Sequence, residues 1–154
     1  MAAIRRLAAA AMLALTAPAY AQGVQITGLS DVAFGTIGSF GTDLVRSQSI
    51  CAFSGLLGGR YSVTASGSGT GGAFTLSNGA AALPYEVQWN TTAGQSSGTG
   101  LTANVALSGQ TMLLSCPVLQ TTNTSLIVIL RAAQLHVATA GNYSGTLTVI
   151  LAAN

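Results

Sequence analysis

The stretch that decides the fold class lies at residues 143–151, which read Tyr-Ser-Gly-Thr-Leu-Thr-Val-Ile-Leu. The apolar residues on one face of this segment are Tyr143, Leu147, Val149 and Leu151. A period of two is typical of a β-strand that buries one face against a core. Residues 61–66 and 85–90 show the same period. The chain is therefore predicted to consist of half-buried strands.

Further strands are predicted between loops rich in Gly, Ser and Thr. Residues 126–130 (Leu-Ile-Val-Ile-Leu) are apolar on both faces, which favours a central strand buried on both sides. Weaker strand candidates lie at residues 74–76, 101–107 and 112–116. One helical turn is predicted at residues 132–137. Loops are placed at residues 35–42, 55–59, 66–72 and 91–100. About seven or eight short strands without a long amphipathic helix predict an all-β sandwich, with Trp89 in its core.

The first 21 residues read as a secretory signal peptide. Two arginines, an apolar segment at residues 7–17 and the cleavage pattern Ala-Tyr-Ala at 19–21 follow the usual order. A membrane anchor is the alternative, but the apolar run is shorter than the roughly 18 residues that span a bilayer. We therefore expect a signal peptide at 1–21 and a single exported domain at 22–154, with no transmembrane segment in the mature chain.

The predicted mature domain is electrically neutral. Its three arginines balance its three carboxylates, and the chain has no lysine. A neutral surface gives no electrostatic reason to bind nucleic acid or anionic lipid. The whole chain is 49% hydrophobic and 5% charged, and such a surface offers little protection against association. This composition suits a protein that lives inside a polymer better than a soluble monomer.

Two cysteines, Cys51 and Cys116, are present in the chain. An isolated pair in an exported protein usually forms a disulfide bridge, and two buried thiols are the alternative. A metal site is not expected, because His136 is the one histidine and zinc sites need three or four ligands.

Two motifs resemble enzyme signatures, and both are better explained as loops. Residues 67–72 fit G-x-G-x-x-G, but a strand pattern follows them where a dinucleotide site needs a helix. Ser96 lies in a G-x-S-x-G match at residues 94–98, but no Asp or Glu follows Glu86 to complete the hydrolase order. We therefore expect no catalytic residue, no cofactor and no enzyme activity.

Several segments, in their order along the chain, resemble the spore coat protein U-like domain family, the pilins of archaic chaperone–usher fimbriae. The segments are Asp-Val-Ala-Phe-Gly at 31–35, Ile-Cys-Ala-Phe at 50–53, Tyr-Ser-Val-Thr at 61–64, Leu-Pro-Tyr-Glu-Val at 83–87 and Ala-Gly-Asn-Tyr-Ser-Gly-Thr-Leu-Thr-Val at 140–149. The match departs from the family at Gly145, where an Asp is usual, and in lacking a cysteine before residue 31.

This resemblance implies an immunoglobulin-like sandwich that lacks its final strand. Leu147, Val149 and Leu151 would then line an acceptor groove beside the last strand. The implied partners are a periplasmic chaperone, an outer-membrane usher and other pilin subunits, and the implied location is the periplasm and then the fimbria at the cell surface. The implied function is a structural pilus subunit assembled by donor-strand exchange.

The segment before residue 31 has two interpretations. About nine residues, 22–30, span roughly 30 Å, which is enough for one strand and not for two. Val24 and Ile26 belong either to the domain's first strand, which predicts a tip subunit, or to a donor segment, which predicts a shaft subunit. Other hypotheses for the whole chain are a secreted β-sandwich that binds carbohydrate or another ligand, and a coat-like structural protein outside any pilus.

Overall fold

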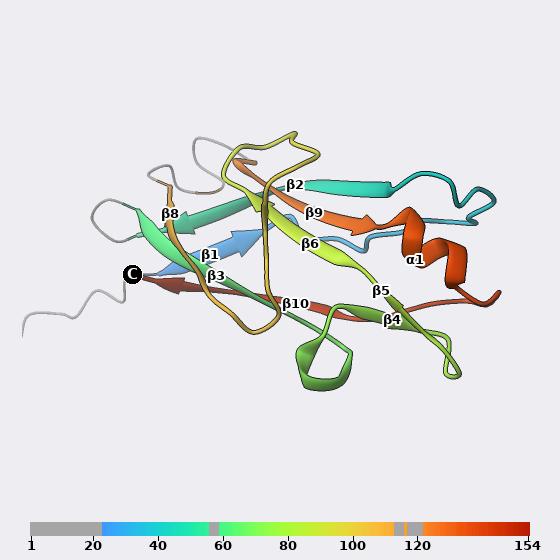
Figure 1. The fold of residues 1–154 in the computed structure, drawn as a ribbon. Helices are drawn as coiled ribbons and strands as arrows, with labels where there is room; N and C mark the ends of the chain where they lie inside the picture. Colours follow the sequence, from blue (N-terminus) through green and yellow to red (C-terminus); the bar gives the residue numbers. More distant parts are fainter. Residues whose placement is uncertain (1–22, 56–58, 113–115, 117–121) are drawn as a thin grey trace, which may run out of the picture.

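The structure is a computed structural model that describes residues 23–55, 59–112, 116 and 122–154. The predicted signal peptide at 1–21 lies outside these residues. Two antiparallel sheets face each other as layers (Figure 1). The all-β sandwich predicted from the alternating segments is therefore confirmed.

The first sheet has five strands in the order β1-β2-β9-β6-β7. Their bounds are Val24–Thr27 (β1), Leu44–Ser54 (β2), Thr124–Leu130 (β9), Glu86–Asn90 (β6) and Thr99–Gly100 (β7). The second sheet has the order β10-β3-β8. Its strands are Leu147–Ala153 (β10), Arg60–Gly67 (β3) and Leu107–Thr111 (β8).

Smaller elements complete the described fold. Strands β4 and β5 pair as a short ribbon, a 3-10 turn η1 precedes β4, and one helix α1 follows β9. Their bounds are Thr75–Ser77 (β4), Ala82–Pro84 (β5), Thr70–Gly72 (η1) and Ala132–Val137 (α1). The helical turn predicted at residues 132–137 is confirmed.

Strand β9 is the central strand that its apolar sequence predicted. It pairs with β2 along one edge, from Leu44↔Leu130 to Ile50↔Thr124, and with β6 along the other. All seven of its residues are buried. The segment after β6 covers part of its outer face, because Ser125 Oγ donates to Thr92 O and accepts from Gln95 N, both at 2.9 Å.

The core lies between the two sheets. The alternation at residues 61–66 places Tyr61, Val63 and Ala65 fully inside. Trp89 is 1% exposed, and its ring meets that of Tyr61 edge to face at 6.5 Å. Burying side chains of this size contributes roughly 1.5–3 kcal/mol each. The prediction that Trp89 is a core residue is confirmed.

Two strand boundaries differ from the sequence prediction. Residues 102–106 form a turn rather than a strand, and β8 begins at Leu107. Asn104 causes this turn, because it takes a left-handed conformation (φ 62°) and its side chain donates to Gly71 O at 2.7 Å. Of the strand predicted at residues 112–116, Met112 and Cys116 do not lie in a strand, and residues 113–115 lie outside the described part of the chain.

Strand β10 begins at Leu147, four residues later than predicted. Before it, Thr146 N donates to Ser68 Oγ at 3.2 Å instead of to a neighbouring strand. Gly145 is required at this point, because a Cβ there would lie 2.9 Å from both Ser68 Oγ and Thr75 O. A larger side chain such as Asp at this position would require Ser68 or the backbone at Thr75 to shift.

The predicted disulfide between Cys51 and Cys116 is present, with a Cα–Cα distance of 5.8 Å. Both residues are buried. The bridge joins positions 65 residues apart, and a loop of this length corresponds to roughly 4 kcal/mol of stabilisation in the chain-entropy account.

Asn123 extends the β9 ladder beside this disulfide. Its Oδ1 accepts from Ala52 N at 2.9 Å, and its Nδ2 donates to Ala52 O at 2.8 Å. The side chain thus imitates a strand residue opposite Ala52. Asn123 is 4% exposed, so the backbone groups of Ala52 depend on this amide for their hydrogen bonds.

We predict that Asn123→Ala lowers the free energy of unfolding by about 2–4 kcal/mol, because it leaves buried backbone groups without partners. Urea unfolding with the disulfide intact measures the change. The matched control is Asn142→Ala, at an exposed position, with an expected change below about 0.5 kcal/mol. Equal losses in the two variants would contradict the role given to Asn123.

Candidate functional site

The candidate site is an open groove along β10. Strand β10 pairs with β3 on one side, and no strand among the described residues pairs with its other side. Across from this edge runs the segment 29–37, which continues β1 without forming a strand. The space between them, called the groove below, has a volume of about 1190 Å³.

One wall of the groove is the segment 29–37. Val32, Phe34 and Ile37 lie on it half-buried and pack against the core. Side chains of β2 hold this wall in place. Gln48 Oε1 accepts from Ser30 N at 3.0 Å and Gln48 Nε2 donates to Ser30 O at 2.6 Å.

Arg46 fixes the same wall further along. Its Nε donates to Ala33 O at 3.2 Å, and its guanidinium lies 5.6 Å from the centre of the Phe34 ring. Among the described residues, no backbone hydrogen bond joins residues 29–37 to a neighbouring strand. Apart from the Ser30 amide and carbonyl and the Ala33 carbonyl, which Gln48 and Arg46 engage, the backbone groups of this wall have no hydrogen-bond partner among the described residues.

The floor of the groove is the hydrophobic core itself. Leu126, Val128 and Leu130 of β9 reach it from the first sheet. Leu83 and Tyr85 join them from the β5–β6 region. All five are at most 7% exposed, so an inserted side chain would contact the centre of the sandwich directly.

The opposite wall consists of residues 138–149. Leu147 and Val149 line the groove, and their role as acceptor residues stays a prediction. Leu151 is half-buried against the core but is not among the lining residues. At that end β1 and β10 come close together although they belong to different sheets, and the groove is open beside the first half of β10.

Val24 and Ile26 lie in the domain's own first strand. Strand β1 pairs with β2 in the register Val24↔Ser54 and Ile26↔Ala52. Both side chains are half-buried and pack against the core. Of the two interpretations that the sequence allowed, the described structure contains the one with these residues inside their own sheet.

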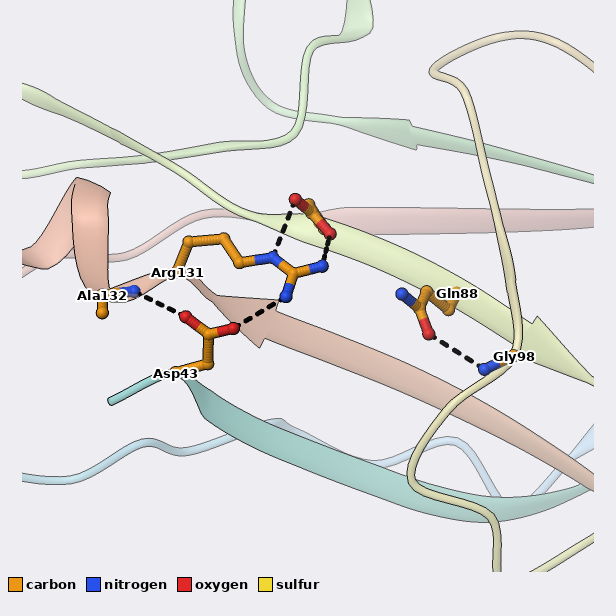
Figure 2. Close-up of polar contacts among 6 residues, drawn as sticks. Asp43, Gln88, Gly98, Arg131 and Ala132 are labelled. Carbon is orange, nitrogen blue, oxygen red and sulfur yellow. Dashed lines mark hydrogen bonds and ion pairs between the residues drawn. The ribbon is translucent and has the colours of Figure 1, made fainter. Parts of the chain in front are cut away.

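An ion-pair cluster fixes helix α1 at the far end of the groove (Figure 2). Arg131, directly after β9, contacts Asp43 through Nη1 at 2.7 Å and Glu86 through Nε at 2.9 Å. Asp43 Oδ1 also accepts from Ala132 N, the first residue of α1, at 2.8 Å. Elsewhere in this view, Gly98 N donates to Gln88 Oε1 at 2.9 Å.

These contacts shift the pKa values of the cluster. The backbone amide of Ala132 and the guanidinium of Arg131 hold the pKa of Asp43 below its ordinary value. The hydrogen bond from Arg131 lowers the pKa of Glu86, and the two carboxylates raise the pKa of Arg131. The cluster thus ties together the starts of β2, β6 and α1, and Leu135 of this helix lines the groove.

No hydrogen bond among the described residues joins Ser96 to His136, the two catalytic candidates of the sequence. Ser96 and His136 are exposed, and neither side chain has a hydrogen bond or ion pair to a described residue. Strand β4, not a helix, follows residues 67–72. Within the described ranges no three potential metal ligands cluster, and none of the helices there could span a membrane.

The sequence did not identify the wall at residues 29–37 or the floor of the groove. The alternation of Val32 and Phe34 was a usable signal for the wall. The floor residues read simply as core, because no sequence signal says that a core is open on one side.

Comparison with known proteins gives a match at the level of fold. The chain is similar to one in a solved structure described as "Chaperone-tip adhesin complex is vital for synergistic activation of CFA/I fimbriae biogenesis", with a TM-score of 0.57 and 19% identity. The match covers 85% of this chain and 41% of the chain in the solved structure. This chain therefore spans less than half the length of that chain. No protein-family model matches the chain, and no curated protein sequence does.

We predict that the Arg131 cluster stabilises the fold in a pH-dependent way. Carboxylates with a lowered pKa contribute stability above their unfolded pKa and lose it as the pH falls through the folded pKa. Arg131→Met should therefore be less stable than the original protein at pH 7, and the difference should shrink below about pH 4. Thermal unfolding across this range measures it.

The control is Arg60→Met, which removes an exposed arginine that has no ion pair among the described residues. This variant should follow the pH dependence of the original protein. A difference between Arg131→Met and the original protein that does not change with pH would contradict the prediction.

Proposed function

We propose that this chain is a structural subunit of a chaperone–usher type fimbria and that its groove accepts a β-strand from another polypeptide. The observation that carries the proposal is the unpaired edge of β10 beside a groove whose floor is the core. An occupant in extended conformation would pair its main chain with this edge and place alternate side chains on the floor.

The physical need for an occupant is clear from the groove. An unpaired strand edge beside apolar side chains is a site of aggregation. Phe40 and Leu29, at 43% and 46% exposure, add apolar surface to the groove. A strand seated there would satisfy backbone groups on both walls and cover this surface.

The proposed partners follow from the resemblance to the spore coat protein U-like pilins and agree with a fold similar to a chain from a fimbrial chaperone–adhesin complex. A periplasmic chaperone would fill the groove first, and a subunit delivered at the outer-membrane usher would replace it. The protein would be exported and would end at the cell surface in the fimbria. We propose no enzyme activity, no cofactor and no nucleic-acid partner.

We further propose a position at or near the distal tip of the fibre. Val24 and Ile26 are already used within the domain's own first sheet. A donor strand must leave its own domain to enter a neighbour, so this strand is unsuited to donation. The groove, in contrast, remains open to accept a strand.

We predict that a strand fused after Asn154 stabilises the protein. The extension has a flexible linker of about ten residues, which reaches roughly 18 Å, followed by alternating Val and Thr with Val facing inward. Because several Val side chains become buried, Tm should rise by about 10 °C or more, and soluble yield should increase. The control extension has Asp in place of each inward Val. A soluble, monomeric original protein that gains nothing from the Val strand would refute the proposal.

The tip position predicts where antibodies bind on assembled fibres. Immunogold labelling with an antibody against this chain should mark fibre ends, because a subunit that does not donate a strand has no subunit ahead of it. Labelling along the whole fibre would contradict the tip position and leave the accepting role of the groove intact.

A further inference from the structure

Tyr85 lines the floor of the groove, and its hydroxyl has no hydrogen-bond partner among the described residues. The residue is 7% exposed and lines the groove. Its ring packs against Phe74 with 5.7 Å between ring centres, which fixes its orientation. Its hydroxyl makes no hydrogen bond to any residue in the described part of the chain.

The second tyrosine of the groove differs in this respect. The hydroxyl of Tyr143 donates a hydrogen bond to Thr139 O at 3.0 Å. The same hydroxyl oxygen lies 3.0 Å from Thr139 Oγ1. Both tyrosines line the same groove, so the contrast does not come from location. The Tyr143 hydroxyl is satisfied within the described chain, whereas the Tyr85 hydroxyl has no partner there.

When a strand occupies the groove, the Tyr85 hydroxyl requires a hydrogen-bond partner on that strand. Water can reach the Tyr85 hydroxyl while the groove is open, but a seated strand excludes water. A buried hydroxyl without a hydrogen bond is unfavourable. The main chain of the strand would be engaged at the rim, with the edge of β10, so an inward side chain is the group that can reach the floor.

We propose that Tyr85 is a specificity-determining residue of the groove: the accepted strand carries a hydroxyl or amide side chain at the one inward position that faces Tyr85, and apolar side chains at its other inward positions. This inference rests on the proposed function. This polar contact would fix the register of the strand in an otherwise apolar groove, because shifting the strand would separate the polar side chain from Tyr85.

The test uses the full chain with the fused strand. Starting from the extension with Val at every inward position, each Val is replaced in turn by Thr, which has nearly the same shape and adds a hydroxyl. At most inward positions Thr should lower the folding equilibrium constant about tenfold or more, because its hydroxyl is buried without a partner. At the position facing Tyr85 this loss should be absent.

The same series in Tyr85→Phe should lose this exception, so that Thr at the facing position becomes at least about fivefold less favourable than in the original protein. The matched control is Tyr143→Phe, in which the exception should persist. The all-Val extension in each variant reports whether the variant folds.

The outcomes separate the two proposals. If the all-Val strand stabilises the protein but Thr is equally unfavourable at every inward position, the specificity role of Tyr85 is overturned and the accepting groove stands. This comparison needs no variant of Tyr85, so it holds even if Tyr85→Phe fails to fold. If no fused strand stabilises the protein, the accepting groove itself is refuted.

Discussion

Pairing of β9 with strands on both of its edges holds the described structure together. Its inward side chains, among them Leu126 and Val128, form the floor of the groove. At its start, Asn123 continues the ladder beside the disulfide, and directly after its end Arg131 gathers two carboxylates beside α1. A change that loosened β9 would therefore reach the covalent bridge, the ion-pair cluster and the candidate site together.

A sandwich with an open groove along one side needs other contacts to keep its two sheets together. The buried disulfide and the Asn123 amide both act near the end of β2, whereas the start of β2 at Leu44 pairs with Leu130, next to α1. The groove lies where such restraints are weaker and where apolar side chains remain partly exposed. The disulfide and the open groove thus lie in different parts of one small fold.

The sequence predicted those parts of the fold that depend on local periodicity. The strands around Val63 and Trp89 and the buried strand β9 follow directly from it. The sequence predicted a strand where the turn around Asn104 lies, because the apolar residues at 101–107 resemble a strand pattern. The alternation of Val32 and Phe34 signals the wall at residues 29–37, but its attachment to β2 could not be predicted, since side chains from later in the chain hold it. The unpaired hydroxyl of Tyr85 is likewise a property of the assembled structure.

The two walls of the groove differ in mechanical character. Strand β10 belongs to a continuous ladder with β3 and can move only if that sheet deforms. The wall at residues 29–37 is held by the side chains of Gln48 and Arg46, whose rotamers can change at little energetic expense. The groove therefore has one rigid wall, strand β10, and one wall at residues 29–37 that can move more easily. The width of the groove therefore depends more on the wall at residues 29–37 than on β10.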